Sequence, residues 1–230
     1  MDNLKHLIFD ADDTLWENNI FYENVRNSFF ILCGNFGISR IEAERQFNQT
    51  EIRLVYEKGY GTTNFLLILD TLFNLLLPPE ALNQFNHLLD KFNETIYRPR
   101  KTFPDVEKTL TALKEKYTLF VLTKGDLEEQ KSKLDNSGLN HFFTDRFIVS
   151  EKDSQTYQTI LAEKKWQSTE VCMIGNSPKS DINPALNAGM WAIFIPYAHT
   201  WFLEDEPLNI DQDKLIRIKQ FSELEKVLGG

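Results

Sequence analysis

The feature of this sequence that most constrains its fold is a series of short apolar runs that alternate with helix-like stretches. Runs with the length and composition of buried strands occur at 4–9, 118–123, 147–150, 171–175 and 190–196. Apolar residues at helical spacing fill parts of the chain between the later runs, including 105–116 and 126–137. Strands that alternate with helices of about 10–15 residues build βαβ units and a parallel sheet. The pattern therefore predicts an α/β fold with a Rossmann-like parallel sheet.

One long stretch, 16–97, interrupts this alternation because it reads as helical throughout. Gly37 stands at the end of its first apolar stripe, where a helix is expected to stop. Ser39 and Glu42 then have the spacing of a capping box that begins the next helix. We interpret the apolar stripes of this stretch as residues that pack in a core.

These patterns predict two domains. Residues 1–15 and 98–230 are expected to form one discontinuous α/β core, and 16–97 to form a helical subdomain inserted after the first strand. The tail of the chain is expected to add a last strand at 215–219, followed by a helix, to the core.

Composition and charge exclude several classes of protein. The 18 Phe and 4 Trp among 230 residues must be buried, which excludes disorder as the main state. No apolar run reaches the length of about 18 residues that a membrane span requires, and the N-terminus lacks the order of a signal peptide. The net charge of −9 disfavours nucleic acid and anionic lipid as partners. Cys33 and Cys172 lie in separate apolar runs, which predicts buried free thiols in a reducing, cytoplasmic compartment.

Two carboxylates follow the first predicted strand, Asp10 and Asp12. Held a few ångströms apart they repel each other, so either one is protonated or both bind a metal ion. A helix N-cap with spare acidic residues is the other interpretation of this segment. The ends of the other strands help to choose between the two.

Polar residues also follow the later strands. Thr123 offers a hydroxyl, and Gly125 after it frees main-chain N–H groups that could hold a phosphate oxygen. Lys152 follows the third strand, and an oxygen-rich loop from Asn176 to Asp181 follows the fourth. Open α/β sheets bind their ligands at the carboxyl ends of the strands. A binding site is therefore expected at this edge of the sheet.

Four segments, in order, resemble the motifs of the haloacid dehalogenase superfamily. LIFDADDTLW resembles the first motif, FVLTKGD the second, and GNSPKSD followed by INPALNAGM the fourth, while Lys152 stands where the third motif has its Lys. The resemblance covers about 4–196, and the helical insertion is similar to the α-helical cap of the first subclass. The segment with Gln130 and Lys131 is most similar to phosphatases whose relatives act on nucleotides, flavin mononucleotide and sugar phosphates.

The resemblance implies a catalytic role for four residues. Asp10 would be the nucleophile that forms an aspartyl-phosphate. Asp12 would protonate the leaving alcohol and then activate water. Thr123 would hold a phosphoryl oxygen, and Lys152 would pair with the nucleophile and the phosphate.

The resemblance also implies a Mg²⁺ site formed by Asp10, the main-chain carbonyl of Asp12, Asn176 and Asp181. The family's fourth motif usually opens Gly-Asp, so Asn176 is a departure that removes one charge. An amide oxygen still coordinates Mg²⁺, and Asp181 could ligate directly or orient a metal-bound water.

Substrate-binding residues are expected in two places. Thr123, Lys124 and Gly125 form the expected phosphate cradle after the second strand. Asn18 and Tyr22, just past the first motif, lie where they could line the substrate pocket, although a solvated helix start explains them equally well.

The resulting hypothesis is a Mg²⁺-dependent phosphomonoester hydrolase of a small phosphorylated metabolite, with no nucleic-acid or membrane partner. A 2-haloacid dehalogenase is the first alternative, against which Asp12 argues, because that reaction needs no acid at this position. A phosphomutase is a second. A catalytically silent binding or regulatory protein, such as a phospho-receiver, is a third and has Asn176 as its support. The sequence does not indicate an oligomeric state or the physiological substrate.

Overall fold

The structure, a computed structural model, describes residues 1, 3–209 and 213–229. The chain divides into two compact units, one of Met1–Asn19 with Arg100–Gly230 and one of Ile20–Pro99. Trp16, which we expected at the start of the helical part, belongs to the first unit. Its main chain bridges to Thr102, and its side chain is fully buried in the core of that unit.

The first unit is built on a parallel sheet. Its strands are β1 (His6–Phe9), β2 (Thr118–Lys124), β3 (Asp145–Val149), β4 (Val171–Gly175), β5 (Trp191–Phe194) and β6 (Leu215–Arg217). They lie in the order β3-β2-β1-β4-β5-β6, and every neighbouring pair is parallel. The predicted α/β fold is therefore confirmed, including the last strand near the end of the chain.

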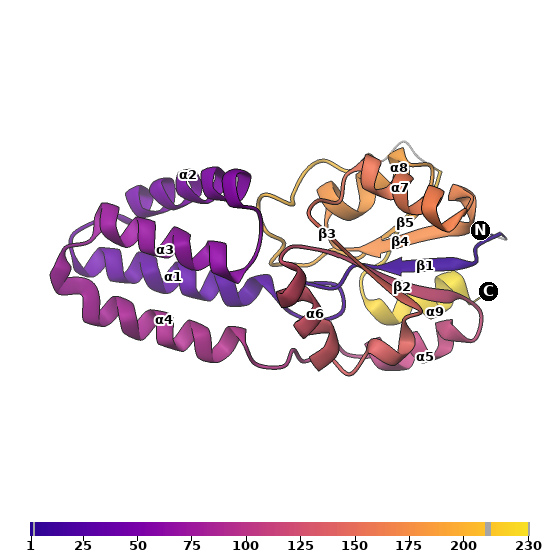
Figure 1. Cartoon of the computed structure of the whole chain (residues 1–230), viewed down its shortest axis with the longest axis horizontal. Coiled ribbons are helices and arrows are strands. Elements are labelled where there is room, and N and C mark those ends of the chain that lie inside the picture. Colours follow the sequence, from indigo (N-terminus) through magenta and orange to yellow (C-terminus); the bar gives the residue numbers. More distant parts are fainter. Residues whose placement is uncertain (2, 210–212, 230) are drawn as a thin grey trace. The chain divides into compact units, whose positions relative to one another are not determined.

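Helices cover both faces of this sheet. They are α5 (Val106–Lys114), α6 (Leu127–Asn136), α7 (Ser154–Lys164), α8 (Asn183–Asn187) and α9 (Leu224–Leu228), with 3₁₀ turns at Asn140–Phe142, Ser168–Glu170 and Phe221–Glu223 and a π-helical turn at Pro178–Ile182. Figure 1 shows α7 and α8 over one face and α5 and α9 over the other. Because successive side chains of a strand point to opposite faces, Leu7 and Phe9 join the apolar core under α5 and α9, whereas Ile8 packs with residues of α7. Burial on both faces explains why the strands appear as continuous apolar runs.

The strand order places the switch point of the sheet beside β1. From β1 the chain proceeds to β2 and β3 on one side, and then returns to β4 on the other side. Ligands of open α/β sheets bind at the carboxyl ends of the strands at such a point. Asp10 follows β1 and Asn176 follows β4, so both residues stand at this position.

The second unit consists of helices with an apolar core of their own. They are α1 (Asn19–Asn35), α2 (Arg40–Lys58), α3 (Thr62–Leu76) and α4 (Leu82–Ile96), with a 3₁₀ turn at Pro79–Ala81. Gly37 has a φ of 81°, which suits glycine at the end of α1, and the Ser39 hydroxyl accepts the Glu42 N–H at the start of α2. Buried phenylalanines from different helices meet in the core, where the ring of Phe29 packs against those of Phe47 and Phe85. These contacts account for the apolar stripes in the sequence.

Two further expectations concern burial. Cys33 and Cys172 are both buried and free, as predicted. Within the described ranges, every helix is too short or too polar to cross a lipid bilayer.

Candidate active site

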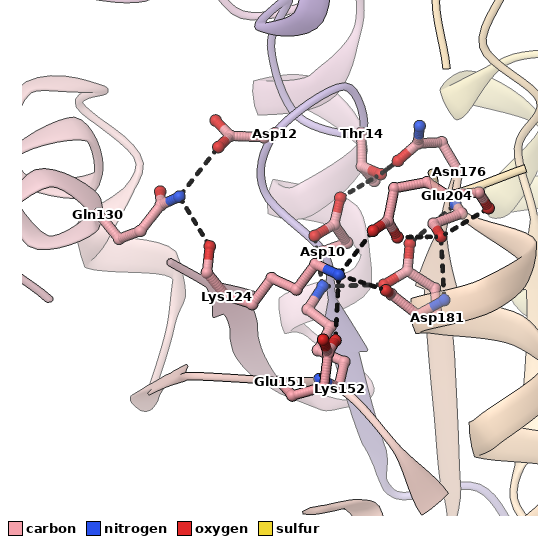
Figure 2. Close-up of polar contacts among 12 residues, drawn as sticks. Asp10, Asp12, Thr14, Lys124, Gln130, Glu151, Lys152, Asn176, Asp181 and Glu204 are labelled. Carbon is pink, nitrogen blue, oxygen red and sulfur yellow. Dashed lines mark hydrogen bonds and ion pairs between the residues drawn. The ribbon is translucent and has the colours of Figure 1, made fainter. Parts of the chain in front are cut away.

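Asp10 lies at the centre of a buried polar cluster. Its main-chain N–H donates to the Ile174 carbonyl at 2.9 Å, which ties the end of β1 to β4. The carboxylate accepts from the Lys152 ammonium at Oδ1 and from the Thr14 hydroxyl at Oδ2, the latter at 2.9 Å. Figure 2 shows the side chains of Asp10, Thr14 and Lys152 converging from two different segments of the first unit. The fold therefore brings residues of the first and third motifs into direct contact.

Asp181 joins the same cluster from the loop after β4. The Lys152 ammonium donates to Asp181 Oδ1 at 2.8 Å, and the Ser177 N–H donates to Asp181 Oδ2 at 2.9 Å. The position of this carboxylate depends on Gly175, because a Cβ there would lie 2.3 Å from Asp181 Oδ2. The glycine of the fourth motif is thus required by close approach of a side chain.

The cluster holds more negative than positive charge. Two buried carboxylates, Asp10 and Asp181, share the single ammonium of Lys152. Burial and the charge of Asp181 raise the pKa of Asp10, and Lys152 only partly offsets them. Burial acts to lower the pKa of Lys152, but the two carboxylates outweigh it and raise that pKa. With all three groups ionised, one negative charge at the end of β1 is uncompensated, and either a proton on Asp10 or an added cation neutralises it.

A divalent cation fits this arrangement in both charge and donor type. Asn176 Oδ1 lies 3.3 Å from the Thr14 hydroxyl that also contacts Asp10, so the amide oxygen and the carboxylate adjoin the same group. Carboxylate and amide oxygens are the ligands that Mg²⁺ prefers, usually together with several waters. In the described part of the chain, no three His, Cys, Asp or Glu side chains form a metal-binding group by themselves. A cation here would therefore also need amide or main-chain oxygens.

Asp12 lies in a different environment from Asp10. Its Oδ1 accepts from Trp16 Nε1 at 2.8 Å, and its Oδ2 accepts from Gln130 Nε2 at 3.0 Å and from Lys133 Nζ at 2.9 Å. Figure 2 shows the carboxylate turned toward Gln130 on α6 and away from Asp10. Burial acts to raise the pKa of Asp12, but the Lys133 charge and these hydrogen bonds outweigh it and lower that pKa. Asp12 is therefore ionised without a metal ion.

Lys133 is a site residue that the sequence analysis missed. Besides Asp12, its ammonium contacts Asn18 Oδ1 at 3.1 Å and Glu129 Oε1 at 3.1 Å. Lys131, which belongs to the segment that resembles those of phosphatases, is instead exposed on α6. Helical spacing was the available signal, because positions i and i+3 share a helix face whereas neighbouring positions do not.

The expected phosphate cradle after β2 is already engaged in contacts with the protein. Thr123 is buried one residue before the end of β2. The Lys124 ammonium donates to carboxylate and hydroxyl oxygens of other loops, and the Gly125 N–H donates to the Val149 carbonyl at 3.1 Å. Gly125 has a φ of 131°, which explains the glycine at this position.

The two residues expected to line a substrate pocket belong to different units. Asn18 lies in the first unit, where its N–H donates to Asp13 Oδ1 at 2.8 Å and its side-chain oxygen accepts from Lys133. Tyr22 lies on α1 in the second unit, and its hydroxyl is 2.8 Å from that of Thr62.

The fold and these motifs are those of a known hydrolase class. A family model of haloacid dehalogenase-like hydrolases matches residues 4–189. The chain therefore belongs to this family, and the predicted resemblance is confirmed.

Individual relatives agree with this assignment. A glyceraldehyde 3-phosphate phosphatase of Methanothermobacter thermautotrophicus is 30% identical over 204 residues, which are 84% of this chain and 85% of that protein. The crystal structure of a haloacid dehalogenase-like family hydrolase from Xanthomonas campestris matches with a TM-score of 0.83 and 26% identity, covering 99% of this chain and 91% of that one. A HAD phosphatase from Thermococcus onnurineus has the same fold, with a TM-score of 0.62, 22% identity and 99% of each chain covered. The prediction of an enzyme that hydrolyses phosphoric monoesters agrees with the names of these phosphatases.

Proposed function

We propose that this chain is a Mg²⁺-dependent phosphatase that acts on a small sugar phosphate through an aspartyl-phosphate. The buried cluster of Asp10, Lys152 and Asp181 carries the proposal. It places a carboxylate nucleophile beside the ammonium group of Lys152, at the switch point of the sheet. The sequence analysis left nucleotides, flavin mononucleotide and sugar phosphates open as substrates. The relatives named glyceraldehyde 3-phosphate phosphatases favour a short sugar phosphate among them.

The first step is an in-line substitution at phosphorus. An oxygen of the Asp10 carboxylate forms a bond to phosphorus while the bond from phosphorus to the ester oxygen breaks. Asp12 gives a proton to the departing alcohol. Its hydrogen bonds keep Asp12 ionised in the absence of substrate. The negative phosphate, once bound, raises the pKa of Asp12, which takes up from the solvent the proton that it then donates.

The second step is hydrolysis of the aspartyl-phosphate. Asp12, now a carboxylate, takes a proton from a water molecule as that water attacks phosphorus, and the bond from phosphorus to Asp10 breaks. Lys152 stays paired with Asp10 and Asp181 through both steps and limits the repulsion between carboxylate and phosphate. Thr123 holds a phosphoryl oxygen.

Mg²⁺ would be held by the carboxylates of Asp10 and Asp181, the amide oxygen of Asn176 and the main-chain oxygen of Asp12. Bound there, it supplies positive charge that the buried cluster lacks and neutralises charge on the phosphoryl group. The helical unit is proposed to act as a cap that excludes water and selects the substrate, with Tyr22 among its pocket residues.

The proposal is tested by phosphate release from a panel of phosphate esters. The panel contains p-nitrophenyl phosphate, glyceraldehyde 3-phosphate, dihydroxyacetone phosphate, a hexose phosphate, a nucleoside monophosphate and flavin mononucleotide, each assayed with Mg²⁺ and with a chelator. We expect Mg²⁺-dependent release that is fastest for the three-carbon phosphates, and no release by Asp10→Asn. Halide release from 2-haloacids without any phosphate release would show that the proposed chemistry is wrong.

A further inference from the structure

Glu204 is a buried acid that none of the four motifs contains. It lies ten residues past the end of β5, in an irregular loop of the first unit, and it is 9% exposed. Its Oε1 accepts from Lys124 Nζ at 2.6 Å, and its Oε2 accepts from the Ser177 hydroxyl at 2.6 Å. Figure 2 shows this carboxylate beside Asp181 and Asn176. One side chain therefore connects the loop after β5 to the end of β2 and to the loop after β4.

The Lys124 ammonium is held by three loops at once. It donates to Glu204 Oε1 at 2.6 Å, to Ser180 Oγ at 2.8 Å and to Glu151 Oε1 at 3.1 Å. An ammonium group has three N–H donors, so these acceptors match its full capacity. Glu204 is the more buried of the two carboxylates, with 12% of its side chain exposed against 42% for Glu151. The Glu204 charge is therefore screened least by water and contributes most to holding Lys124.

A continuous chain of hydrogen bonds leads from Glu204 to the nucleophile. The Ser177 hydroxyl donates to Glu204, and the Ser177 N–H donates to Asp181 Oδ2 at 2.9 Å. Asp181 Oδ1 accepts from Lys152, which in turn donates to Asp10. Ser177 is therefore the link through which a displacement at Glu204 would reach the reacting carboxylate.

The backbone that follows Ser177 makes further contacts with Glu204. Pro178–Ile182 forms a π-helical turn, in which the Ile182 N–H donates to the Ser177 carbonyl at 3.1 Å. Such turns are rare and are found mainly at functional sites. Two residues of this turn are linked to Glu204. The Lys179 N–H donates to the Glu204 carbonyl at 3.3 Å, and the Ser180 hydroxyl and the Glu204 carboxylate both accept from Lys124.

We infer that Glu204 is a positioning residue of the active site, which places Asp181, Lys152 and Asp10 by holding Ser177 and Lys124. The inference rests on the proposed phosphatase function. In this inference Lys124 holds the surrounding loops in place, whereas the sequence led us to expect that it contacts phosphate. The inference also assigns a role in catalysis to the loop after β5, which lies outside the four motifs.

Glu204→Gln is the decisive variant because it keeps the size of the side chain. Its amide oxygen still accepts from Lys124, but its NH₂ group then faces the Ser177 hydroxyl, which already accepts from the Ser180 N–H at 2.9 Å. The 2.6 Å bond from the Ser177 hydroxyl to the Glu204 carboxylate is lost, and the hydroxyl keeps its longer contact of 3.3 Å with the Glu204 main-chain carbonyl. Misplacement of reacting groups by about 1 Å lowers rates by up to about 10²-fold, and a partial shift should cost less. We expect kcat for p-nitrophenyl phosphate to fall by about tenfold and KM to change by less than about twofold.

Asp205→Asn is the matched control, because it makes the same chemical change at the exposed neighbouring residue. Wild type, Glu204→Gln and Asp205→Asn are compared for kcat, KM and the fraction folded at the assay temperature. Inactivity of the wild type would refute the proposed function itself. A wild type that is active, with Glu204→Gln equal to Asp205→Asn or slower only in proportion to its unfolded fraction, would overturn the positioning role alone.

Ser177→Ala tests whether Glu204 acts through the proposed chain. Residues that act along one chain of contacts give non-additive losses. The double variant Ser177→Ala with Glu204→Gln should therefore lose no more of kcat than the more impaired single variant. Losses that multiply in the double variant would overturn the route through Ser177.

Discussion

The replacement Asp12→Asn tests the proposed chemistry and the geometry of the site together. The three partners of the Asp12 carboxylate described above are all hydrogen-bond donors, namely Trp16 on Oδ1 and both Gln130 and Lys133 on Oδ2. Asparagine offers one acceptor oxygen and one NH₂ group. Whichever way the amide turns, its NH₂ group faces at least one of these donors.

The expected cost in stability follows from the partners that remain. A buried donor left without an acceptor costs about 1–3 kcal/mol. Gln130 keeps the Lys124 carbonyl at 3.0 Å, and Lys133 keeps Asn18 and Glu129, so neither loses all of its acceptors. The amide oxygen replaces only one carboxylate oxygen, so an N–H of Trp16, Gln130 or Lys133 that donates to Asp12 still loses its acceptor, and we expect the free energy of unfolding to fall by about 1–3 kcal/mol.

The expected cost in rate depends on the leaving group. Loss of a general acid and base lowers rates by about 10²–10⁴-fold. Alkyl phosphates should show this loss in full, whereas nitrophenyl phosphate should lose less because its leaving group departs without a proton. The measurements are kcat/KM over a series of leaving groups and urea unfolding of the same samples.

Asp105→Asn provides the control, since Asp105 is exposed and its φ of 64° suits asparagine as well. Asp105→Asn should change neither kcat/KM nor the free energy of unfolding. An equal loss for Asp12→Asn across all leaving groups would rule out Asp12 as the proton donor. Unchanged stability of that variant would contradict the hydrogen-bond arrangement around it.

Three further replacements test the cluster around Asp10. Asp10→Asn should abolish turnover but leave the metal-free protein at least as stable as wild type, because it removes the uncompensated buried charge; a loss of stability in urea unfolding would contradict this. Gly175→Ala should lower the free energy of unfolding by about 1–3 kcal/mol and reduce kcat, because the added Cβ would displace Asp181. If both quantities equal those of the wild type, the Asp181 carboxylate moves freely. Asn176→Asp should lower the half-saturating Mg²⁺ concentration several-fold, a net gain of about 1 kcal/mol after desolvation and repulsion. Superimposable Mg²⁺ titrations of that variant and wild type would place residue 176 outside the metal's ligands.

The order of secondary-structure elements could be predicted because the central strands β1, β2 and β4 are buried on both faces. Such strands appear as continuous apolar runs, and their ends are marked by the polar residues that follow. The boundary of β3 shows the limit of this reasoning. The strand begins at Asp145, two residues before the predicted start at 147, because its pairing with β2 is made by main-chain groups and tolerates polar side chains. Hydrophobic periodicity alone does not detect such residues.

The candidate site could be predicted in part for a related reason. The carboxyl ends of parallel strands meet at one edge, so residues after β1, β3 and β4 were expected together, and Asp10, Lys152 and Asp181 do meet there. Lys133 and Glu204 could not be found in this way. The first acts from a helix face whose direction depends on packing, and the second lies in an irregular loop without periodicity.

Asp10 and Asp12 have identical side chains but different proposed roles, and their surroundings account for the difference. Asp12 faces one ammonium and two neutral donors, so it is ionised by contacts within the protein alone. Asp10 shares its ammonium with Asp181, and its pKa is raised as a result of burial and that second charge. A nucleophile must be deprotonated, so Asp10 needs additional positive charge where Asp12 needs none. Pairs of titratable groups whose pKa values are pushed apart commonly mark distinct roles in catalysis. In the proposed function, the nucleophile Asp10 therefore depends on Mg²⁺. The proton relay through Asp12 depends instead on Gln130 and Lys133 of α6.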